Sequence, residues 1–403
     1  MSVRLMIVTA EFPHGITEVF FLPELMELQK KCEKLLIVPR SPKKKIIHDI
    51  PKLVLDLCNN TPLLNAEICW TALLYSVQHP IRILKALFFL FRGRGLRNLL
   101  HNAAVFPKAL WLAQVASREN ITHIHAHWGT TTSTMAIIAS LVTGIPWSMT
   151  LHRGDILGNN LLLIKCRKAS FVRFISEDGL RLAEHVLGEV LPGQSTVIHL
   201  GVAIPDIPLA QGIRKDQKIL FCPARLDEIK DHKSLIEASR ILITAGVSVQ
   251  VWLAGDGSQK KALQDYVIKQ KLERNILFYG NYPHEAIIDL YKNRTVDIVV
   301  ISSLYEGVPV ALLEAMSYGI PVVGTNVGGT PELLGEGAGL LVPPKNPVAL
   351  ADALMSLIKS EKLQEQLSER GRNQVISGWD ARETGRRFLS LIEGSSEVPS
   401  CRE

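Results

Sequence analysis

Two carboxylates separated by seven residues, Glu306 and Glu314, are the first candidates for chemistry. Pro309 suits the start of a helix, because its fixed backbone angle is helical and its missing N–H is not needed there. Gly319 favours a stop shortly after Glu314. Glu306 is therefore predicted in a loop and Glu314 on the helix that follows. The backbone N–H groups between them and the positive end of the helix attract phosphate, which predicts a site for a nucleotide sugar.

A strand predicted over Lys218 to Cys222 is followed by two cations, Arg225 and Lys230. Arg225 can hold two phosphate oxygens with its planar guanidinium, and Lys230 can act as a mobile point charge on a leaving diphosphate. An ordinary salt-bridged loop explains the same residues, with nearby acidic side chains as partners. Those acidic neighbours are Asp227, Glu228 and Asp231.

His123, His125 and His127 alternate along one predicted strand and so share one face. A metal site is one interpretation, but three ligands in line along a strand converge poorly on a tetrahedral ion. The favoured interpretation has the first two satisfied in the core and His127 emerging at the ligand-binding edge. His152 follows the next strand, close to Asp155, and is predicted as a site residue rather than a core histidine.

These candidates need a large scaffold, and the composition provides one. A chain of 403 residues exceeds what one core usually serves, so two domains are expected, and 47% hydrophobic residues exclude a disordered chain. The net charge of +6 is modest and scattered, which argues against nucleic acid as a partner. Six cysteines show no paired spacing, which predicts reduced thiols in a cytoplasm. The first residues read as a buried strand rather than a signal peptide.

Residues 81–97 form the nearest approach to a membrane segment, although they are too short and too charged to span a bilayer. One interpretation is a helix packed in the first domain with cations reaching to solvent, which a full apolar stripe favours. The alternative is a helix on an anionic membrane surface. Its head-group ligands would then be Arg82, Lys85, Arg92, Arg94 and Arg97.

Short β-branched runs alternate with amphipathic helices, which predicts an α/β fold with two parallel sheets. Six strands are expected in each half, and the proline- and glycine-rich stretch 201–216 is the expected hinge. Such sheets bind ligands at the carboxyl ends of their strands, so the site is expected in an interdomain cleft. The expected domains are 1–203 on the acceptor side and 204–376 for the donor, and 377–403 is expected to carry a helix back to the first domain.

The second half resembles the donor domain of a retaining glycosyltransferase of family 4 with the GT-B fold. The resemblance rests on motifs in a fixed order: Arg225 with Lys230, Gly255-Asp256-Gly257, Tyr279-Gly280, Ser302-Ser303, the Glu306/Glu314 pair, Gly319-Ile320-Pro321 and Gly328-Gly329-Thr330-Pro331-Glu332. The first half resembles bacterial exopolysaccharide or colanic-acid-type transferases. Its motifs are Glu11-Phe12-Pro13, Thr17-Glu18-Val19-Phe20-Phe21, His125-Ala126-His127-Trp128 and His152-Arg153-Gly154-Asp155.

The resemblance implies transfer of a sugar from a nucleotide diphosphate, UDP or GDP favoured, to a glycan or lipid-linked hydroxyl, with retention and without a metal or other cofactor. Glu306 would meet the sugar, Glu314 the ribose, and Arg225 and Lys230 the diphosphate. His152 would lie beside the reacting centre. The other implied donor residues are Gly280, Asn281, Gly307, Val308, Pro309 and Val310, and the acceptor-side candidates are Gly15, Glu18, His127 and Asp155.

The sequence departs from the usual residues of the family at two places, and two other functions stay open. Asp231 replaces a glycine that is usual after the lysine, and it is expected to cap the next helix while placing a negative charge near the phosphates. The first loop carries only Gly15 where many relatives have adjacent glycines. A catalytically silent nucleotide-binding scaffold and a sugar-nucleotide epimerase are the competing functions. The location is expected to be cytoplasmic, with a peripheral position at the inner membrane face as a further option.

Overall fold

The protein is described from a computed structural model that covers residues 2–15, 18–42, 46, 48–92, 95–191, 194–206 and 216–396. Several sequence predictions lie outside these residues: Thr17, Arg94, Cys401 and the central part of the expected hinge, 207–215. The described chain forms two compact units, which are treated separately. Unit 1 comprises Met1–Gly201 and Arg382–Glu403, and unit 2 comprises Val202–Ala381.

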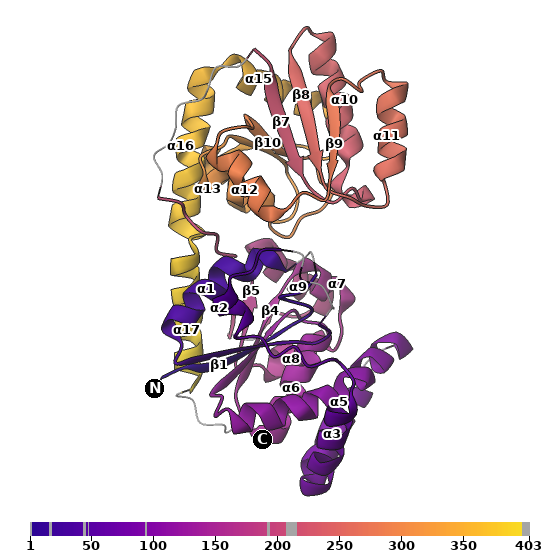
Figure 1. Cartoon of the computed structure of the whole chain (residues 1–403), viewed down its shortest axis with the longest axis vertical. Helices are drawn as coiled ribbons and strands as arrows, with labels where there is room; N and C mark the ends of the chain where they lie inside the picture. Colours follow the sequence, from indigo (N-terminus) through magenta and orange to yellow (C-terminus); the bar gives the residue numbers. More distant parts are fainter. Residues whose placement is uncertain are drawn as a thin grey trace. The chain divides into compact units, whose positions relative to one another are not determined.

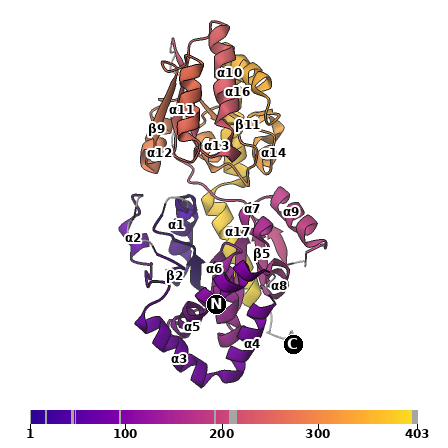
Figure 2. The ribbon, with the colours of Figure 1, turned by 90° about the vertical axis from the view of Figure 1, so that its right-hand side faces the viewer.

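Unit 1 contains a six-stranded parallel sheet in the order β2-β1-β3-β4-β5-β6. Its strands are β1 (Arg4–Thr9), β2 (Lys34–Pro39), β3 (His123–His127), β4 (Trp147–Leu151), β5 (Phe171–Phe174) and β6 (Ser195–Val197). The helices are α1 (Leu22–Lys31), α2 (Lys52–Leu55), α3 (Ala66–Gln78), α4 (Pro80–Phe91), α5 (Leu96–Arg118), α6 (Thr131–Thr143), α7 (Arg153–Gly158), α8 (Leu162–Lys168) and α9 (Glu177–Leu187). Figures 1 and 2 show helices on both faces of this sheet.

Unit 2 repeats the plan with the order β12-β11-β10-β7-β8-β9, again parallel throughout. Its strands are β7 (Lys218–Pro223), β8 (Val249–Ala254), β9 (Ile276–Gly280), β10 (Ile298–Ile301), β11 (Val322–Thr325) and β12 (Leu340–Val342). The helices are α10 (His232–Thr244), α11 (Lys260–Lys269), α12 (His284–Lys292), α13 (Val310–Ser317), α14 (Thr330–Leu334), α15 (Pro347–Lys359) and α16 (Glu361–Gly378). The predicted α/β class with two Rossmann-like sheets is confirmed.

Alternation along β1 shows how unit 1 builds its core. Leu5 and Ile7 point to one face of the sheet, and Met6 and Val8 point to the other. The first face is covered by α1 and by the last helix, α17 (Ala381–Ser396), which contributes Phe388. The second face is covered mainly by α5 and α6. The predicted return of the C-terminal helix to the first sheet is therefore observed, because α17 belongs to the core of unit 1.

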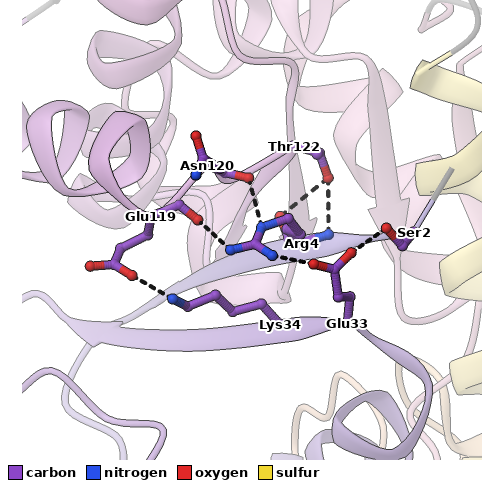
Figure 3. Close-up of polar contacts among 7 residues, drawn as sticks. All are labelled: Ser2, Arg4, Glu33, Lys34, Glu119, Asn120 and Thr122. Carbon is purple, nitrogen blue, oxygen red and sulfur yellow. Dashed lines mark hydrogen bonds and ion pairs between the residues drawn. The ribbon is translucent and has the colours of Figure 1, made fainter.

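A polar network fastens the amino ends of the strands in unit 1 (Figure 3). The Arg4 side chain donates to the carbonyls of Glu119 and Asn120, at 3.0 Å each, and pairs with Glu33. Lys34 pairs with Glu119 in turn. These contacts tie β1 and β2 to the end of α5, so the amino end of the sheet is bonded internally and the carboxyl end is left for the loops that carry the candidate residues.

Helix α4 shows which side chains of residues 81–97 pack in the first unit and which are exposed. One face does pack in the core, through Ile83, Ala86 and Phe89, but Leu84 and Phe88 are 69% and 63% exposed. The packing that the favoured interpretation expects is therefore observed on one face, and a second apolar face is exposed. Arg82 is also not a free cation, because its Nη1 donates to the carbonyl of Val142 at 2.6 Å. Among the described residues, no helix is both long and apolar enough to cross a membrane.

Candidate functional site

The strand order of unit 2 reverses between β7 and β10, which is where open parallel sheets form binding crevices. The loop after β7 carries Lys230 and the loop after β10 carries Glu306. Lys230 Nζ lies 2.6 Å from Glu306 Oε1, so the fold joins two side chains that are 76 residues apart. Both are largely removed from solvent, and this pair is the centre of the candidate donor site.

The two carboxylate oxygens of Glu306 have different surroundings. Ser303 Oγ donates to Oε1 at 2.5 Å, and Lys230 donates to the same oxygen. Ser303 is itself fixed, because Thr325 Oγ1 donates to its carbonyl at 2.6 Å. In the described part of the chain, no hydrogen bond is found to Oε2. Oε1 therefore holds the carboxylate in place, and Oε2 is the oxygen that can accept from a ligand hydroxyl.

Glycines set the backbone on which these side chains stand. A Cβ at Gly328 would lie 1.8 Å from the Glu306 carbonyl oxygen, and one at Gly329 would lie 2.2 Å from that of Gly307. In the same way, a Cβ at Gly255 would lie 2.1 Å from the Ala224 carbonyl oxygen. The Gly255-Asp256-Gly257 turn therefore supports the loop that follows β7. This close packing gives the turn a structural role and needs no dinucleotide to explain it.

Arg225 lies apart from the Lys230–Glu306 pair. Its Nη1 is 2.7 Å from Asp227 Oδ2, and its side chain is 63% exposed. The salt-bridge interpretation is thus correct for Arg225, whereas Lys230 pairs with Glu306 and not with the acidic residues of its own loop. An exposed guanidinium with one neighbouring carboxylate remains able to turn toward an anion.

The second carboxylate, Glu314, lies on α13 and pairs with His284. His284 Nε2 is 2.8 Å from Glu314 Oε1. Burial lowers the pKa of His284, but the hydrogen bond and charge of Glu314, with Glu285, outweigh burial and leave the pKa raised. Sequence reasoning missed His284. The only signal was its place one residue after the Gly280–Pro283 turn predicted to meet the base.

The first turn of α13 and the turn after β9 hold the other predicted donor residues. Helix α13 begins at Val310 with Pro309 as N-cap, one residue later than predicted. Its leading N–H groups have no acceptor within the helix, which suits an anion. Gly280 has φ +67°, Asn281 is exposed, and Tyr282 lies 5.7 Å from Tyr279 between ring centroids. Gly307 and Val308 connect these features to Glu306, and Val308 is buried.

Asp231 explains why a glycine is expected at its position. Its φ is +44°, in the left-handed region that glycine adopts without cost and aspartate tolerates. The side chain caps α10 as predicted: Oδ1 accepts from the Ser234 N–H at 3.4 Å and Oδ2 from Ser234 Oγ at 2.6 Å. The carboxylate is therefore engaged with α10.

In unit 1 the strand order reverses between β1 and β3, and Glu18 bridges the loops that follow them. Its carboxylate accepts from the N–H groups of Ala10, Glu11 and Phe12 at 3.0, 2.6 and 2.7 Å, and from the indole of Trp128. Glu18 is buried and its acceptors are occupied. It holds the loop in place, which makes it a supporting residue rather than a direct ligand of the acceptor.

His152 and His127 meet in this same part of unit 1. Their Nε2 atoms are 3.2 Å apart, and Trp128 lies 4.2 Å from the His152 ring between centroids. Phe21 stacks on His127 at 4.0 Å. Burial lowers the pKa of His152 to about 3 and that of His127 well below its usual value, so both rings are neutral at pH 7. His127 is fully buried, which corrects the expectation that it emerges at the edge.

Asp155 and Gly15 shape the two loops beside His152. Asp155 Oδ2 accepts from the His152 N–H at 3.0 Å, and burial raises the pKa of Asp155 to about 6. Lys165, also buried, donates to the carbonyls of Gly129 and Thr130 at 3.0 and 2.7 Å. Gly15 has φ +84°, so the loop after β1 uses the one glycine that the sequence supplies there.

His123 and His125 are satisfied in the core, as predicted. Ser148 Oγ lies 2.7 Å from His123 Nε2 and 2.8 Å from His125 Nδ1, and Thr150 Oγ1 lies 2.9 Å from His125 Nε2. The alternation of Ser148 and Thr150 on β4 was the available signal. Over the residues described, no group of three or more His, Cys, Asp or Glu side chains is arranged to hold a metal ion.

Comparison with known proteins places this geometry in a family. The model of glycosyl transferases group 1 matches residues 204–374, which include Lys230, Glu306 and Glu314. Residues 204–374 belong to the glycosyl transferases group 1 family. The match spans most of unit 2, so the candidate donor site lies within a glycosyltransferase domain.

Three relatives extend the comparison. N-acetyl-alpha-D-glucosaminyl L-malate synthase of Bacillus anthracis is 27% identical over 281 residues, 66% of this chain and 72% of the relative. A Salmonella typhimurium glycosyltransferase named for colanic acid biosynthesis, WcaL, is 32% identical over 204 residues, 48% of this chain and 47% of the relative. HepE of Anabaena, in complex with UDP and glucose, has a TM-score of 0.73 at 16% identity, over 97% of this chain and 99% of that chain. The last shows the fold, and the GT-B expectation is confirmed.

Proposed function

We propose that the protein transfers a sugar from a nucleotide diphosphate to a hydroxyl group, with retention of configuration at the anomeric carbon. The observation that carries the proposal is the Lys230–Glu306 contact of 2.6 Å at the strand reversal of a group 1 domain. Lys230 would move its charge to the departing diphosphate, with Arg225 turning from Asp227 to assist. Glu306 Oε2 would accept from a sugar hydroxyl, and the N-terminus of α13 would face phosphate.

Retention is proposed through a front-face route. Retaining glycosidases use two carboxyl groups about 5 Å apart, one of them as nucleophile. The hydrogen-bond partners found for Glu306 within the described chain are a lysine and a serine, which orient the carboxylate and do not supply a partner acid. The leaving phosphate would then take the acceptor proton, and positioning with charge stabilisation would supply most of the rate. His152 is proposed, from the resemblance, to orient the sugar.

UDP-sugars are the first donors to test, since HepE was determined with UDP-glucose bound. Glu314 is proposed for the ribose and the Gly280–Asn281 turn for the base. The acceptor is proposed to be a glycan or lipid-linked hydroxyl on the cytoplasmic side. Metal independence is also proposed, because Arg225 and Lys230 can provide the positive charge that a diphosphate needs.

The test is NMR of the protein with UDP-, GDP- and ADP-sugars, with and without EDTA, following binding and release of the diphosphate. Selective binding, release unchanged by EDTA and a product with the donor's anomeric configuration support the proposal. Glu306→Ala should lose at least about 100-fold in turnover while nucleotide affinity stays equal or rises. The matched control is Glu273→Gln, an exposed carboxylate of unit 2. Binding without release, even with lipid or glycan acceptors added, indicates a scaffold, and a changed sugar nucleotide that is not consumed indicates an epimerase; either refutes transfer.

A further inference from the structure

Helix α3 exposes a complete apolar stripe. Trp70, Leu73, Leu74 and Val77 follow the i, i+3, i+4, i+7 spacing of one helix face, and each is exposed. Trp70 is 61% exposed, although large aromatic side chains usually pack inside. The opposite side of α3 supplies Ile68 to the core. The exposed stripe is therefore additional to the face that folding uses.

Helix α4 continues the stripe after the junction at His79. Ile81, Leu84 and Phe88 repeat the helical spacing on the outside, and Ile81 is 73% exposed, as is Val77 just before the junction. Figure 2 shows that α3 and α4 are consecutive helices at the edge of unit 1. Two adjoining helices therefore each expose a row of large apolar side chains, and exposed apolar patches mark interaction sites.

The charges around this stripe have one sign. Lys85 and Arg92 lie on the exposed side of α4, and Arg97 opens α5 beside exposed Leu96. The guanidinium carbon of Arg92 lies 5.2 Å from the centre of the Phe88 ring, which places a cation at the border of the apolar stripe. Over residues 61–101 the sequence has five Lys or Arg and one acidic residue, Glu67. Glu67 accepts from the indole of Trp111 at 3.0 Å and so faces the protein.

We propose that these residues form a docking surface for an anionic lipid bilayer. The α3–α4 surface consists of Trp70, Leu73, Leu74, Val77, Ile81, Leu84 and Phe88 with the cations Lys85, Arg92 and Arg97. Apolar side chains enter the interface while the cations stay at the level of the phosphates, which is the arrangement of an interfacial helix. A second copy of the chain would bring the same cations against each other, so like-charge repulsion disfavours that occupant. The inference does not depend on glycosyl transfer.

The surface differs from the contact predicted for 81–97 in two respects. Helix α3 supplies four of the seven apolar side chains, although no membrane role was predicted for its residues. Arg82 leaves the set of head-group ligands, since its guanidinium is bonded to the end of α6 through Val142. Arg82 instead provides a variant that separates stability from lipid binding: Arg82→Gln should lower the unfolding temperature and leave vesicle binding within about two-fold.

Co-sedimentation with phosphatidylcholine vesicles, with and without phosphatidylglycerol, tests the proposal. The full chain should bind the anionic vesicles and weaken at high salt, because surface charge attraction is screened. Replacing Lys85 or Arg97 by Gln should weaken binding about five-fold each. Phe88→Ser should weaken it at least about ten-fold. Ile268→Ser and Lys261→Gln on α11 are the matched controls, since both are exposed and carry no membrane role.

The fluorescence of Trp70 tests how deeply the α3–α4 surface enters the bilayer. Bromine-labelled acyl chains should quench the fluorescence of the full chain, and Trp70→Phe should abolish most of the quenching. Of the other tryptophans in unit 1, Trp111 and Trp147 are buried, and Trp128 is partly buried with its indole bonded to Glu18. Three results overturn the proposal: no vesicle binding, equal binding with and without phosphatidylglycerol, or a concentration-dependent dimer that Leu84→Ser disrupts. Because the substituted positions are exposed, the variants should stay folded, and melting curves of each variant check this.

Discussion

Neutralising Glu306 should leave UDP binding intact or improve it, although turnover falls. In the structure Lys230 Nζ is 2.6 Å from Glu306 Oε1, so a diphosphate must compete with this carboxylate for the ammonium group. Two unit charges about 4 Å apart interact by about 4 kcal/mol at an effective dielectric constant of about 20. Lys230 keeps 20% of its side chain exposed, so screening reduces the usable energy to about 1–2 kcal/mol.

That energy sets the expected pattern across three variants. Glu306→Gln keeps the shape and releases Lys230, so affinity for UDP should stay equal or rise by up to about ten-fold. Lys230→Met removes the ammonium group and should lower affinity about ten-fold, and it leaves a nearly buried carboxylate without its cation, which destabilises the fold. The double variant should be more stable than Lys230→Met, because the uncompensated charge is gone.

Isothermal titration with UDP and thermal unfolding of the same samples measure both quantities. Glu273→Gln reports the effect of removing an exposed charge elsewhere in unit 2. The reasoning fails if Glu306→Gln weakens UDP binding as much as Lys230→Met does. That result would mean that Glu306 supports the diphosphate site and does not compete for it.

Three further outcomes follow from the geometry. Asp231→Gly should lower the free energy of unfolding by only a few tenths of a kcal/mol, and Asp231→Ala should lower it by about 1–2 kcal/mol. Alanine costs more because it loses the cap to Ser234 and also adopts φ +44° poorly. Equal losses for the two variants in urea melts would contradict this. Burial raises the pKa of Asp155 from 3.8 to about 6, so the folded state favours the protonated carboxyl group. Its contribution to the free energy of unfolding is therefore complete below pH 3.8 and is lost as the pH rises through about 6. Asp155→Asn should therefore remove about 3 kcal/mol of pH dependence, and an unchanged pH profile of unfolding would count against the assignment. The pKa of His284 is also raised, so its contribution to the free energy of unfolding is present below pH 6.5 and is lost as the pH rises through the pKa of the folded state. Glu314→Gln should lower the pKa of His284 in an NMR titration. An unchanged pKa would exclude the ion pair between the two side chains.

The sequence predicted the strands well, because buried parallel strands are short β-branched runs bounded by loops. The strand predicted over Lys218 to Cys222 is β7 (Lys218–Pro223), and the described residues contain the six strands expected in each half. The helix expected within 377–403 is α17 (Ala381–Ser396). Helix α4 was predicted as a helix, but its environment was not, because periodicity shows a helix's apolar faces and does not show how many of them find a partner.

At the candidate site, local spacing identified Glu306, Glu314, Lys230 and the cap at Asp231. It offered the pairing of Arg225 with Asp227 as one alternative, but it did not predict that Glu314 meets His284 or that Lys230 meets Glu306. The two pairings that were missed join segments that are 30 and 76 residues apart in the chain. Pairing across loops depends on the order of the strands, which residue types along one segment do not encode.

The sequence by itself determined which residues carry charge, where strands and helices begin, and which positions must be glycine for close approach. The tertiary structure alone decided that His123 and His125 are satisfied by Ser148 and Thr150, that Glu18 holds the loop after β1, and that α3 keeps an apolar stripe outside. The physical reason is that polar satisfaction and burial are properties of neighbours. Neighbours in a parallel sheet come from segments tens of residues apart, and only the folded chain brings them into contact.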